Sequence, residues 1–521
     1  AMELNYIDLF DRAARISAGR PALVDETGTL TYAEAGARAN RIASALVARG
    51  FGPSTRFAIF SPNCSAAMLA MLAGGKAGGA WCNINVRNAI GMNVDILARG
   101  KCEAVFFHSS TAPLVENIRA GVPTLRFAVC VDDELPGFDS LAALARAGSE
   151  APINVHLAPD AVGFQGSTGG TTGAPKVTQG GQAFLTWNAI GFMTEFHFDR
   201  PPVNLAVAPI THAGGIVAMA TLALGGTVVF MATADLDKLL DAIALHRVSL
   251  LFLPPTVIYM LINHPRIRET DLSSLKYLVS AAAPFAVEKI AAAHAIFGPV
   301  ICQSFGQTES GFPLTFMSPS AITEALENPA LAGRLKSVGL PTANVSAIEI
   351  MDDAGNLLGP GEVGEIVMRG PTAMHRYIDD PAATEAIQQH GWQHTGDLGF
   401  RDKDGFIYVS DRKRDLIISG GFNVFPLEVE QVLASHPAVQ DCAVIGVPDE
   451  KWGEAVKAIV ELAPGRQVTE AELLELCRAK LGSIVGPKSV EFIDALPRSA
   501  VGKVLKRELR DRYWQGRSSR I

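Results

Sequence analysis

Cysteine is scarce in this sequence, and the positions of the cysteines form no pattern. Seven cysteines are scattered over 521 residues, with no C-x-x-C pair and no histidine partners at zinc-ligand spacing. A chain of this length has no need of disulfide bonds to hold its core together. We therefore expect reduced thiols and, with them, a cytoplasmic location.

The sequence also lacks an uninterrupted apolar segment that could target or span a membrane. Charged residues interrupt the first thirty positions, which excludes the apolar core of a signal peptide. Residues 213–234 are uncharged and long enough to cross a bilayer. However, Gly225 and Gly226 divide them into a helix-like half and a β-branched half. We expect a buried helix and strand there, and no integral membrane segment.

A surplus of positive charge is missing as well. The sequence has 53 acidic and 45 basic residues and a formal net charge of -8. A nucleic-acid duplex would therefore find no broad basic surface on this chain. We do not expect nucleic acid as a partner.

The order of apolar and polar residues predicts an α/β protein of several units. Amphipathic helices alternate with short apolar strands, which is the pattern of parallel sheets covered on both faces. From about residue 363 the pattern shifts toward hairpins, and a small α+β region follows the charged residues 411–415. We expect a large N-terminal domain (1–411) with parallel-rich αβα layers and a small barrel, a hinge (412–415) and a small, mobile C-terminal domain (416–521).

The segment from Gly166 to Lys176, GSTGGTTGAPK, has the chemistry of a phosphate-binding loop and follows a strand-like run. Its glycines let backbone amides converge on an anion, its hydroxyls add donors, and its lysine supplies a positive charge. It is not a Walker A loop, because Pro175 stands between the last glycine and the lysine. A flexible linker would have no reason to end in Pro-Lys at the exit of a strand.

Within this segment, residues 168–176 resemble the phosphate loop of the adenylate-forming (ANL) superfamily, which includes acyl-CoA synthetases, amino-acid-adenylating domains and luciferases. Chance does not align the further segments that resemble signatures of this family in the family's order. These are FGQTE at 305–309, HTGD at 394–397, DRKRD at 411–415 with GGFN at 420–423, VPDEKWGE at 447–454 and LPRSAVGK at 496–503. The resemblance implies an acyl-CoA synthetase that uses ATP, Mg²⁺ and coenzyme A.

The resemblance places ATP on residues that suit its parts. Glu309 offers a carboxylate oxygen to Mg²⁺, which prefers few protein carboxylates, and Thr308 can donate to the α-phosphate. Asp397 is a strong acceptor for the ribose hydroxyls, and Arg412 also reaches the ribose. The other nucleotide-binding positions implied are Thr168, Gly170, Thr171, Thr172, Gly173 and Lys176 at the phosphates, and Ala282, Ala283, Gln303, Phe305 and Gly306 around the adenine.

The C-terminal region contributes a catalytic lysine by the same resemblance. Lys503 would bridge the substrate carboxylate and the α-phosphate, where charge develops as pyrophosphate leaves. The resemblance implies that the C-terminal domain then rotates about Arg414. This rotation would bring Gly420 and Gly421 toward the pantetheine of coenzyme A for thioester formation.

His212, in the segment PITHAGG, resembles the histidine that lines the acyl pocket of the family. We assign it a positioning or gating role and no acid-base chemistry. The other pocket positions implied are Ala213, Gly214, Phe252, Ala281, Ser304 and Gly311. Most are small and none is charged, which predicts room for a bulky or extended apolar acid and argues against a dicarboxylate.

Some residues depart from the family pattern without removing a catalytic charge. They are Gly169 and Val177 in the phosphate loop, Phe305 in place of the commoner tyrosine, and Arg376, for which the sequence offers no physical reason.

We predict an AMP-forming acid:CoA ligase that acts through an acyl-adenylate on a medium/long-chain fatty, alicyclic or aryl acid. Its partners would be small molecules, and a homodimer is considered.

Three alternatives stay open. An amino-acid-adenylating domain would need an acidic partner for the substrate ammonium, where this sequence has Thr211 and His212. A luciferase-like enzyme shares the motifs and differs in its product. A non-catalytic nucleotide-binding regulator would have lost Glu309, Asp397 or Lys503, and all three are present.

Overall fold

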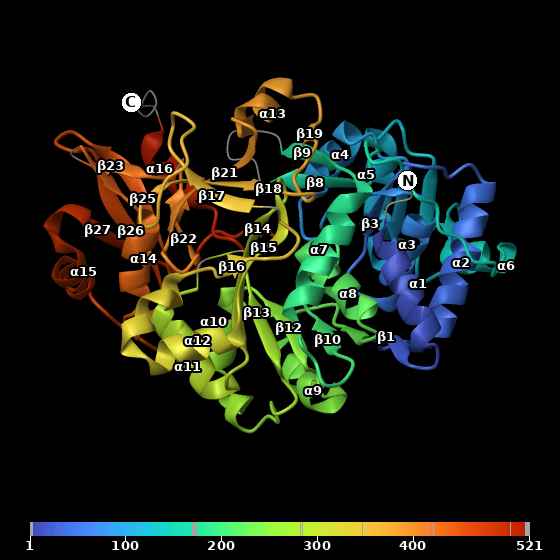
Figure 1. The fold of residues 1–521 in the computed structure, drawn as a ribbon, viewed down its shortest axis with the longest axis horizontal. Coiled ribbons are helices and arrows are strands. Elements are labelled where there is room, and N and C mark those ends of the chain that lie inside the picture. The colour runs from blue at the N-terminus through green and yellow to red at the C-terminus, as the bar shows by residue number, and fades with distance from the viewer. Residues whose placement is uncertain are drawn as a thin grey trace.

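The computed structural model describes residues 4–168, 175–281, 283, 285–345, 347–413, 415–419, 421–500 and 502–515. The described residues form four sheets, of nine, eight, five and five strands. Figure 1 shows the N-terminal part, in blue, at one end of the molecule and the C-terminal part, in orange and red, at the other end. The expected α/β fold with a smaller C-terminal α+β part is confirmed.

The eight-stranded sheet is mostly parallel, and the phosphate-loop segment runs from its strand β8 to its strand β9. Its parallel strands run in the order β8, β4, β3, β5, β6 and β7, and β9 and β19 extend it antiparallel beyond β8. The strands are β3 (Arg56–Phe60), β4 (Ala80–Cys82), β5 (Ala104–Phe107), β6 (Phe127–Cys130), β7 (Asp139–Ser140), β8 (Phe164–Thr168), β9 (Lys176–Gly180) and β19 (Arg376–Tyr377).

The described residues before Val203 form seven α-helices. The helix that follows Thr31 begins with a capping box, because the Thr31 and Glu34 side chains accept hydrogen bonds from each other's backbone amides. The helices are α1 (Tyr6–Ile16), α2 (Tyr32–Ala48), α3 (Ser65–Lys76), α4 (Ile90–Arg99), α5 (Ala112–Gly121), α6 (Leu141–Ala147) and α7 (Gln182–Glu195), with a short 3₁₀ turn η1 (Ser109–Thr111).

The nine-stranded sheet lies beside the first and is parallel over its middle six strands. Its order is β16, β15, β14, β13, β12, β10, β11, β1 and β2, with β2, β15 and β16 antiparallel to their neighbours. The strands are β1 (Pro21–Asp25), β2 (Gly28–Thr31), β10 (Val203–Ala206), β11 (Thr227–Phe230), β12 (Leu250–Leu253), β13 (Tyr277–Ser280), β14 (Ile301–Gln307), β15 (Gly311–Met317) and β16 (Leu340–Pro341).

The uncharged segment 213–234 folds as predicted into a buried helix and a strand, α8 (Ala213–Ala223) and β11. Among the residues that the structure describes, no helix is long and apolar enough to cross a membrane. The other helices of this part are α9 (Leu236–His246), α10 (Pro255–Ile262), α11 (Val287–Phe297), α12 (Pro319–Glu327), η2 (Pro265–Arg268) and η3 (Pro329–Lys336).

Where the N-terminal domain was expected to contain a small barrel, the described residues form a branched five-stranded antiparallel sheet. Strand β22 pairs with β21, and Ile407 on its other edge exchanges backbone hydrogen bonds with Val338 and Gly339, so β22 continues toward β16 and does not close onto β17. The elements are β17 (Ala347–Met351), β18 (Gly364–Arg369), β20 (Gln388–Gln389), β21 (Trp392–Arg401), β22 (Ile407–Arg412) and α13 (Pro381–Ile387).

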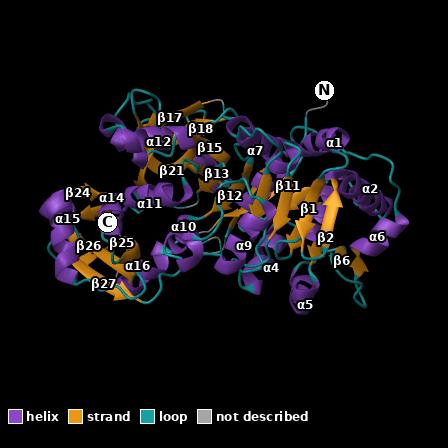
Figure 2. Cartoon of the chain, turned by 90° about the horizontal axis from the view of Figure 1, so that it is seen from below, coloured by secondary structure: helices purple, strands orange, loops and turns teal. Residues whose placement is uncertain are grey.

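The C-terminal part is a second five-stranded sheet with helices, seen at one end of the molecule in Figure 2. Pro426 starts its first helix, because proline suits the first helical position. Its elements are β23 (Ile417–Ser419), β24 (Phe422–Val424), β25 (Val439–Asp449), β26 (Gly453–Leu462), β27 (Ser489–Ile493), α14 (Pro426–Ala434), α15 (Glu470–Val485) and α16 (Lys506–Trp514).

Candidate active site

The turn between β14 and β15 carries Thr308 and Glu309 and meets the eight-stranded sheet. A Cβ atom on Gly166 would lie 2.1 Å from Thr308 Cγ2, so only a glycine in β8 admits the Thr308 side chain there. Strand β14 begins at Ile301 and continues through the FGQ segment to Gln307, an extension that no local pattern indicates. The antiparallel pairing of Phe305 with Thr315 explains this extension.

Glu309 is held from two sides. The Tyr377 hydroxyl of β19 donates a 2.9 Å hydrogen bond to Glu309 Oε1, and the Met374 amide donates to the Glu309 carbonyl at 2.8 Å. Burial and the neighbouring Glu309 carboxylate raise the pKa of Tyr377, so the phenol stays protonated and remains a donor. The Glu309 carboxylate is therefore oriented through one oxygen.

The ends of the predicted phosphate loop lie beside this carboxylate. Thr168 ends β8 and Lys176 begins β9, and the two residues face each other in the ladder. The ammonium of Lys176 lies 5.0 Å from the centre of the Tyr377 ring and 3.7 Å from Asp380 Oδ2. The remaining predicted loop positions lie outside the described residues, namely Gly170, Thr171, Thr172 and Gly173.

The predicted adenine-binding residues follow one another along β14. Gln303 is 7% exposed, and Phe305 packs against the apolar cluster around Leu314. A Cβ atom on Gly306 would lie 2.5 Å from the Gly311 carbonyl oxygen, so the close β14–β15 pairing requires glycine there. Ala283 is described and half-buried, whereas Ala282 lies outside the described residues.

The predicted ribose-binding pair comes from adjacent strands of the branched sheet. Asp397 in β21 and Arg412 in β22 are register partners, and Arg412 Nε lies 2.7 Å from Asp397 Oδ1. Asp397 is only 2% exposed, and its backbone amide donates to the Thr395 hydroxyl at 3.1 Å. The Gln307 amide donates to the Thr395 carbonyl at 3.2 Å, which ties this pair to β14.

The loop that carries Lys503 reaches the N-terminal part. A Cβ atom on Gly502 would lie 3.7 Å from Pro254 and 3.8 Å from Thr256, at the start of α10. Gly421, in contrast, is exposed, and a Cβ atom there would meet no atom of the described residues within 4 Å. The predicted residues Arg414 and Gly420 lie outside the described residues.

Residues 10–378 match the family model of the AMP-binding enzyme, and residues 428–503 match that of the AMP-binding enzyme C-terminal domain. The chain belongs to the AMP-binding enzymes. It is an acyl-CoA synthetase of the adenylate-forming superfamily.

Relatives and solved structures agree with this assignment. The chain is 35% identical over 504 residues to a feruloyl-CoA synthase of Amycolatopsis, covering 96% of this chain and 98% of that one. It is 37% identical over 372 residues to a medium/long-chain-fatty-acid–CoA ligase of Mycobacterium tuberculosis, covering 70% and 63%. The amide bond synthetase McbA of Marinactinospora thermotolerans superposes with a TM-score of 0.86 at 29% identity, covering 98% and 100%.

His212 precedes α8 in this acyl-CoA synthetase, and the structure holds its ring from one side. Its Nδ1 atom lies 3.3 Å from Asn83 Nδ2, and its Nε2 atom is buried and bonds to none of the described residues. Burial lowers the pKa of His212 to about 4, so the imidazole is neutral near pH 7. A neutral ring can donate a hydrogen bond without bringing a charge into the pocket.

The other predicted pocket residues of the enzyme lie around a cluster of aromatic side chains. Phe252 and Ala281 belong to this apolar cluster, and Ala213 packs against it. At two predicted pocket positions, Ser304 and Gly311, neighbouring groups take up space that we expected to be open. The Ser304 hydroxyl donates to the Thr315 carbonyl, and Thr372 and Asn188 fill the space beside Gly311. A Cβ atom on Gly214 would lie 2.6 Å from the Ala208 carbonyl oxygen, so the backbone leaves no room for a larger residue there.

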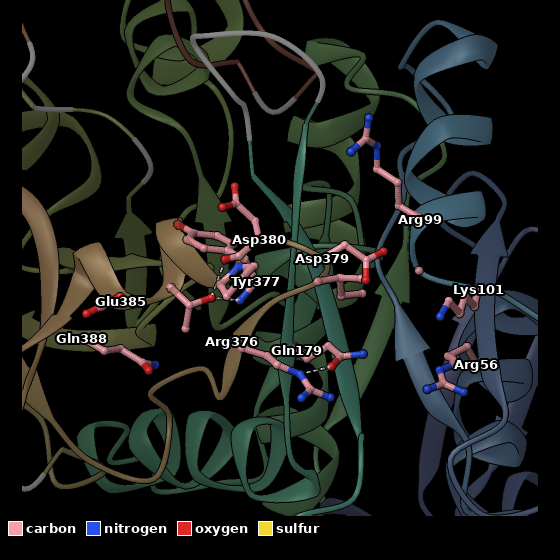
Figure 3. A pocket seen from close by; sticks show the side chains of 14 residues that line it. Arg56, Arg99, Lys101, Gln179, Arg376, Tyr377, Asp379, Asp380, Glu385 and Gln388 are labelled. Atoms are coloured by element: carbon pink, nitrogen blue, oxygen red, sulfur yellow. Dashed lines mark hydrogen bonds between the residues drawn. The ribbon is translucent and has the colours of Figure 1, made fainter.

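A hollow of about 600 Å³ lies beside β19 in the enzyme, and Figure 3 shows side chains that line it. Arg376, unexplained by the sequence, lies on its wall and donates from Nε to Gln179 Oε1 of β9 at 2.9 Å. This bond fastens β19, and with it Tyr377, to the phosphate-loop strand. Because Asp380 lines the hollow and contacts Lys176, the hollow borders the predicted phosphate site.

Several residues of this enzyme contact the predicted site residues without being predicted from the sequence. Tyr377 orients Glu309, and Glu365 accepts from the Gly396 amide at 3.0 Å, next to Asp397. Asn83 contacts His212. Each is a single polar residue without a local motif.

We predict that the enzyme loses stability through His212 in mild acid. The folded-state pKa is depressed from 6.5 to about 4, so between these values the unfolded chain binds a proton that the folded chain excludes. The free energy of unfolding should therefore fall as the pH is lowered from about 6.5 toward 4. His212→Gln removes this contribution, so its urea midpoint should drop less between pH 7 and pH 5. Equal drops in both proteins would contradict the assignment.

Proposed function

We propose that this enzyme is an AMP-forming carboxylic acid:coenzyme A ligase for an apolar acid, of the medium/long-chain fatty, alicyclic or aryl class. One observation carries the proposal: the Thr308–Glu309 turn, the phosphate-loop ends and the Asp397–Arg412 pair converge from three sheets. The named activities of the feruloyl and fatty-acid relatives support the apolar class.

In the proposed first step, a carboxylate oxygen of the acid attacks the α-phosphorus of ATP, and the bond to pyrophosphate breaks. Lys176 and the phosphate loop hold the departing phosphates, and Asp397 with Arg412 fixes the ribose. The ammonium of Lys503 stabilises the charge that develops between the acid and the α-phosphate. In the second step, the thiol of coenzyme A attacks the acyl carbon, and AMP leaves.

Glu309 fits the Mg²⁺ ion that the family implies. Tyr377 occupies one carboxylate oxygen and orients the group. Among the described residues, no three His, Cys, Asp or Glu side chains gather at one point. Mg²⁺ commonly takes one or two carboxylates and completes its shell with phosphate oxygens and water, so a single Glu suits it. Bound there, Mg²⁺ would neutralise charge on the phosphates.

We also propose the division into residues 1–411, a hinge at 412–415 and a mobile part at 416–521. The Lys413 amide donates to the Gly396 carbonyl at 2.9 Å, which supports anchoring of the chain to the branched sheet up to this point. The contact of Gly502 with Pro254 supports the orientation in which Lys503 serves the adenylation step. Gly420 and Gly421 would approach coenzyme A after rotation about Arg414.

A second candidate function keeps the adenylation step and changes the acceptor. The likeness to an amide bond synthetase over nearly the whole chain favours an amine in place of the thiol. The two candidates share every residue proposed for the first step. They differ only in what attacks the acyl-adenylate.

A panel of acids tests the proposal directly. Fatty, alicyclic and aryl acids are incubated with ATP, Mg²⁺ and either coenzyme A or a primary amine, and AMP and the acyl product are measured. We expect acyl-CoA and AMP from at least one apolar acid, and no turnover of the matching dicarboxylic acid, because the proposed pocket offers it no cationic partner. Amide without thioester would select the second candidate. No AMP from any acid would refute both.

Lys503→Ala should separate the two half-reactions. We expect acid-dependent pyrophosphate release to fall by about 100-fold or more, because a fixed charge is lost where transition-state charge develops. Transfer from a supplied acyl-adenylate to coenzyme A should stay within about twofold. Lys480→Ala, which changes an exposed lysine of α15, is the control. Equal loss in both half-reactions would refute the assigned role.

Tyr377→Phe should raise the Mg²⁺ concentration needed for half-maximal adenylation by about tenfold, since partners that orient a metal ligand typically contribute this much or more. Tyr408→Phe is a matched control, because its hydroxyl also donates to a carboxylate, Asp402 Oδ2, at 3.0 Å. Steady-state rates over a Mg²⁺ titration measure the effect. Unchanged Mg²⁺ dependence in Tyr377→Phe would remove Glu309 from the proposed metal site.

A further inference from the structure

Asn83, at the end of β4, is a buried polar residue that belongs to none of the family motifs. It is 5% exposed and bridges two predicted parts of the site. Its Oδ1 atom accepts from the Ser167 amide at 2.8 Å, in the strand that leads into the phosphate loop. Its Nδ2 atom lies 3.3 Å from Nδ1 of His212, which precedes α8.

The orientation of the Asn83 amide follows from its partners. A backbone N–H can only donate, so the Asn83 atom that faces Ser167 must be the carbonyl oxygen. The amide nitrogen therefore faces His212. Because this nitrogen donates, Nδ1 of His212 is the acceptor, and the single proton of the neutral ring lies on Nε2.

The backbone before α8 holds the ring where Asn83 can reach it. Asn63 donates from Nδ2 to the carbonyls of Ala206 and Ala208 at 3.0 Å and accepts from the Ile210 amide at 2.9 Å. A Cβ atom on Gly215 would lie 2.0 Å from the Ile210 carbonyl oxygen, so the turn is too tight for any other residue. The segment is fixed independently of Asn83, which therefore acts on the ring itself.

The donor that this arrangement creates has no acceptor among the described residues. Nε2 of His212 is buried and bonds to none of them. A buried N–H without a partner is unfavourable, so an acceptor from a bound ligand would complete the site. A carboxylic acid substrate brings such acceptors, and its reacting oxygens must lie near the phosphate loop.

We propose that Asn83 is a positioning residue of the acid-activating step: it fixes His212 as an Nε2–H donor to an oxygen of the acid and couples this donor to the phosphate-loop strand through Ser167. The inference deepens the proposed function and rests on it. It adds a residue that sets how the acid is oriented relative to ATP.

Asn83→Asp separates the two contacts of Asn83. The new carboxylate still accepts from the Ser167 amide, but it cannot donate to His212 and instead attracts a proton to Nδ1. We expect the KM for the acid to rise about tenfold, the size of one lost hydrogen bond to a charged group, while the KM for ATP stays within about twofold. Asn83→Ala loses both contacts, so both KM values should rise.

The tautomer is read directly by NMR of the full chain carrying ¹⁵N-labelled histidine, with His212 assigned by the signal that His212→Gln removes. The wild-type chain should show the proton on Nε2, and Asn83→Asp should show it on Nδ1. A wild-type His212 protonated on Nδ1 would overturn the inference without any Asn83 variant, so a variant that fails to fold does not leave it untested.

A double-mutant cycle completes the test. His212→Gln places an amide N–H near the Nε2 position, and that donor does not depend on a tautomer. Asn83→Asp should then change the KM for the acid less than twofold in the His212→Gln background. An equal effect in both backgrounds, or a tautomer switch without a KM change, would overturn the positioning role. Failure of the wild-type chain to release AMP from any acid would instead overturn the proposed function, while the tautomer result would still be read.

Discussion

The hydrogen bond from Tyr377 to Glu309 is the contact on which the arrangement of the site depends. Tyr377 belongs to β19, a two-residue strand that lies between β18 and β20 of the branched sheet in the chain but pairs with β9 of the eight-stranded sheet. Glu309 lies in the turn between β14 and β15 of the nine-stranded sheet. One phenol therefore joins two sheets at the point where the phosphate loop starts. The hydrogen bond from Arg376 to Gln179 keeps β19 in register with β9. Arg376, which departs from the family pattern, therefore stabilises the junction between the two sheets.

Close packing between the two large sheets also fixes the position of the Thr308–Glu309 turn. Thr308 fits only because Gly166 has no side chain, and Gly306 is required by the approach of the β15 backbone. These glycines bring the chemistry-bearing turn against β8. The third sheet is attached through the hydrogen bond from Gln307 to Thr395, two residues from Asp397. A change at any of these contacts would shift a proposed ATP contact without touching ATP.

Much of this could be predicted from the sequence wherever the signal is local. The Thr31–Glu34 cap, the strand Arg56–Phe60 and the helix–strand break at Gly225 follow from neighbouring residues alone. The length of β14 does not follow from neighbouring residues, because the second half of this strand pairs with β15 across a tight turn. Asn83 and His212 are 129 positions apart, and no pattern within either segment indicates that they meet. Roles that arise from such long-range contacts require the fold.

The C-terminal part places its two proposed functional loops in different surroundings. Gly502 packs near Pro254 and so brings the Lys503 loop to the N-terminal part, whereas Gly421 faces solvent. Both loops belong to the C-terminal part, which has apolar clusters of its own. Exposed Ile418 and Phe422 flank Gly421, each 53% exposed, and burial of such side chains against the N-terminal part would favour a second orientation. If both loops serve catalysis, as we propose, they must do so in sequence, and the charged segment after β22 is where the chain has to turn.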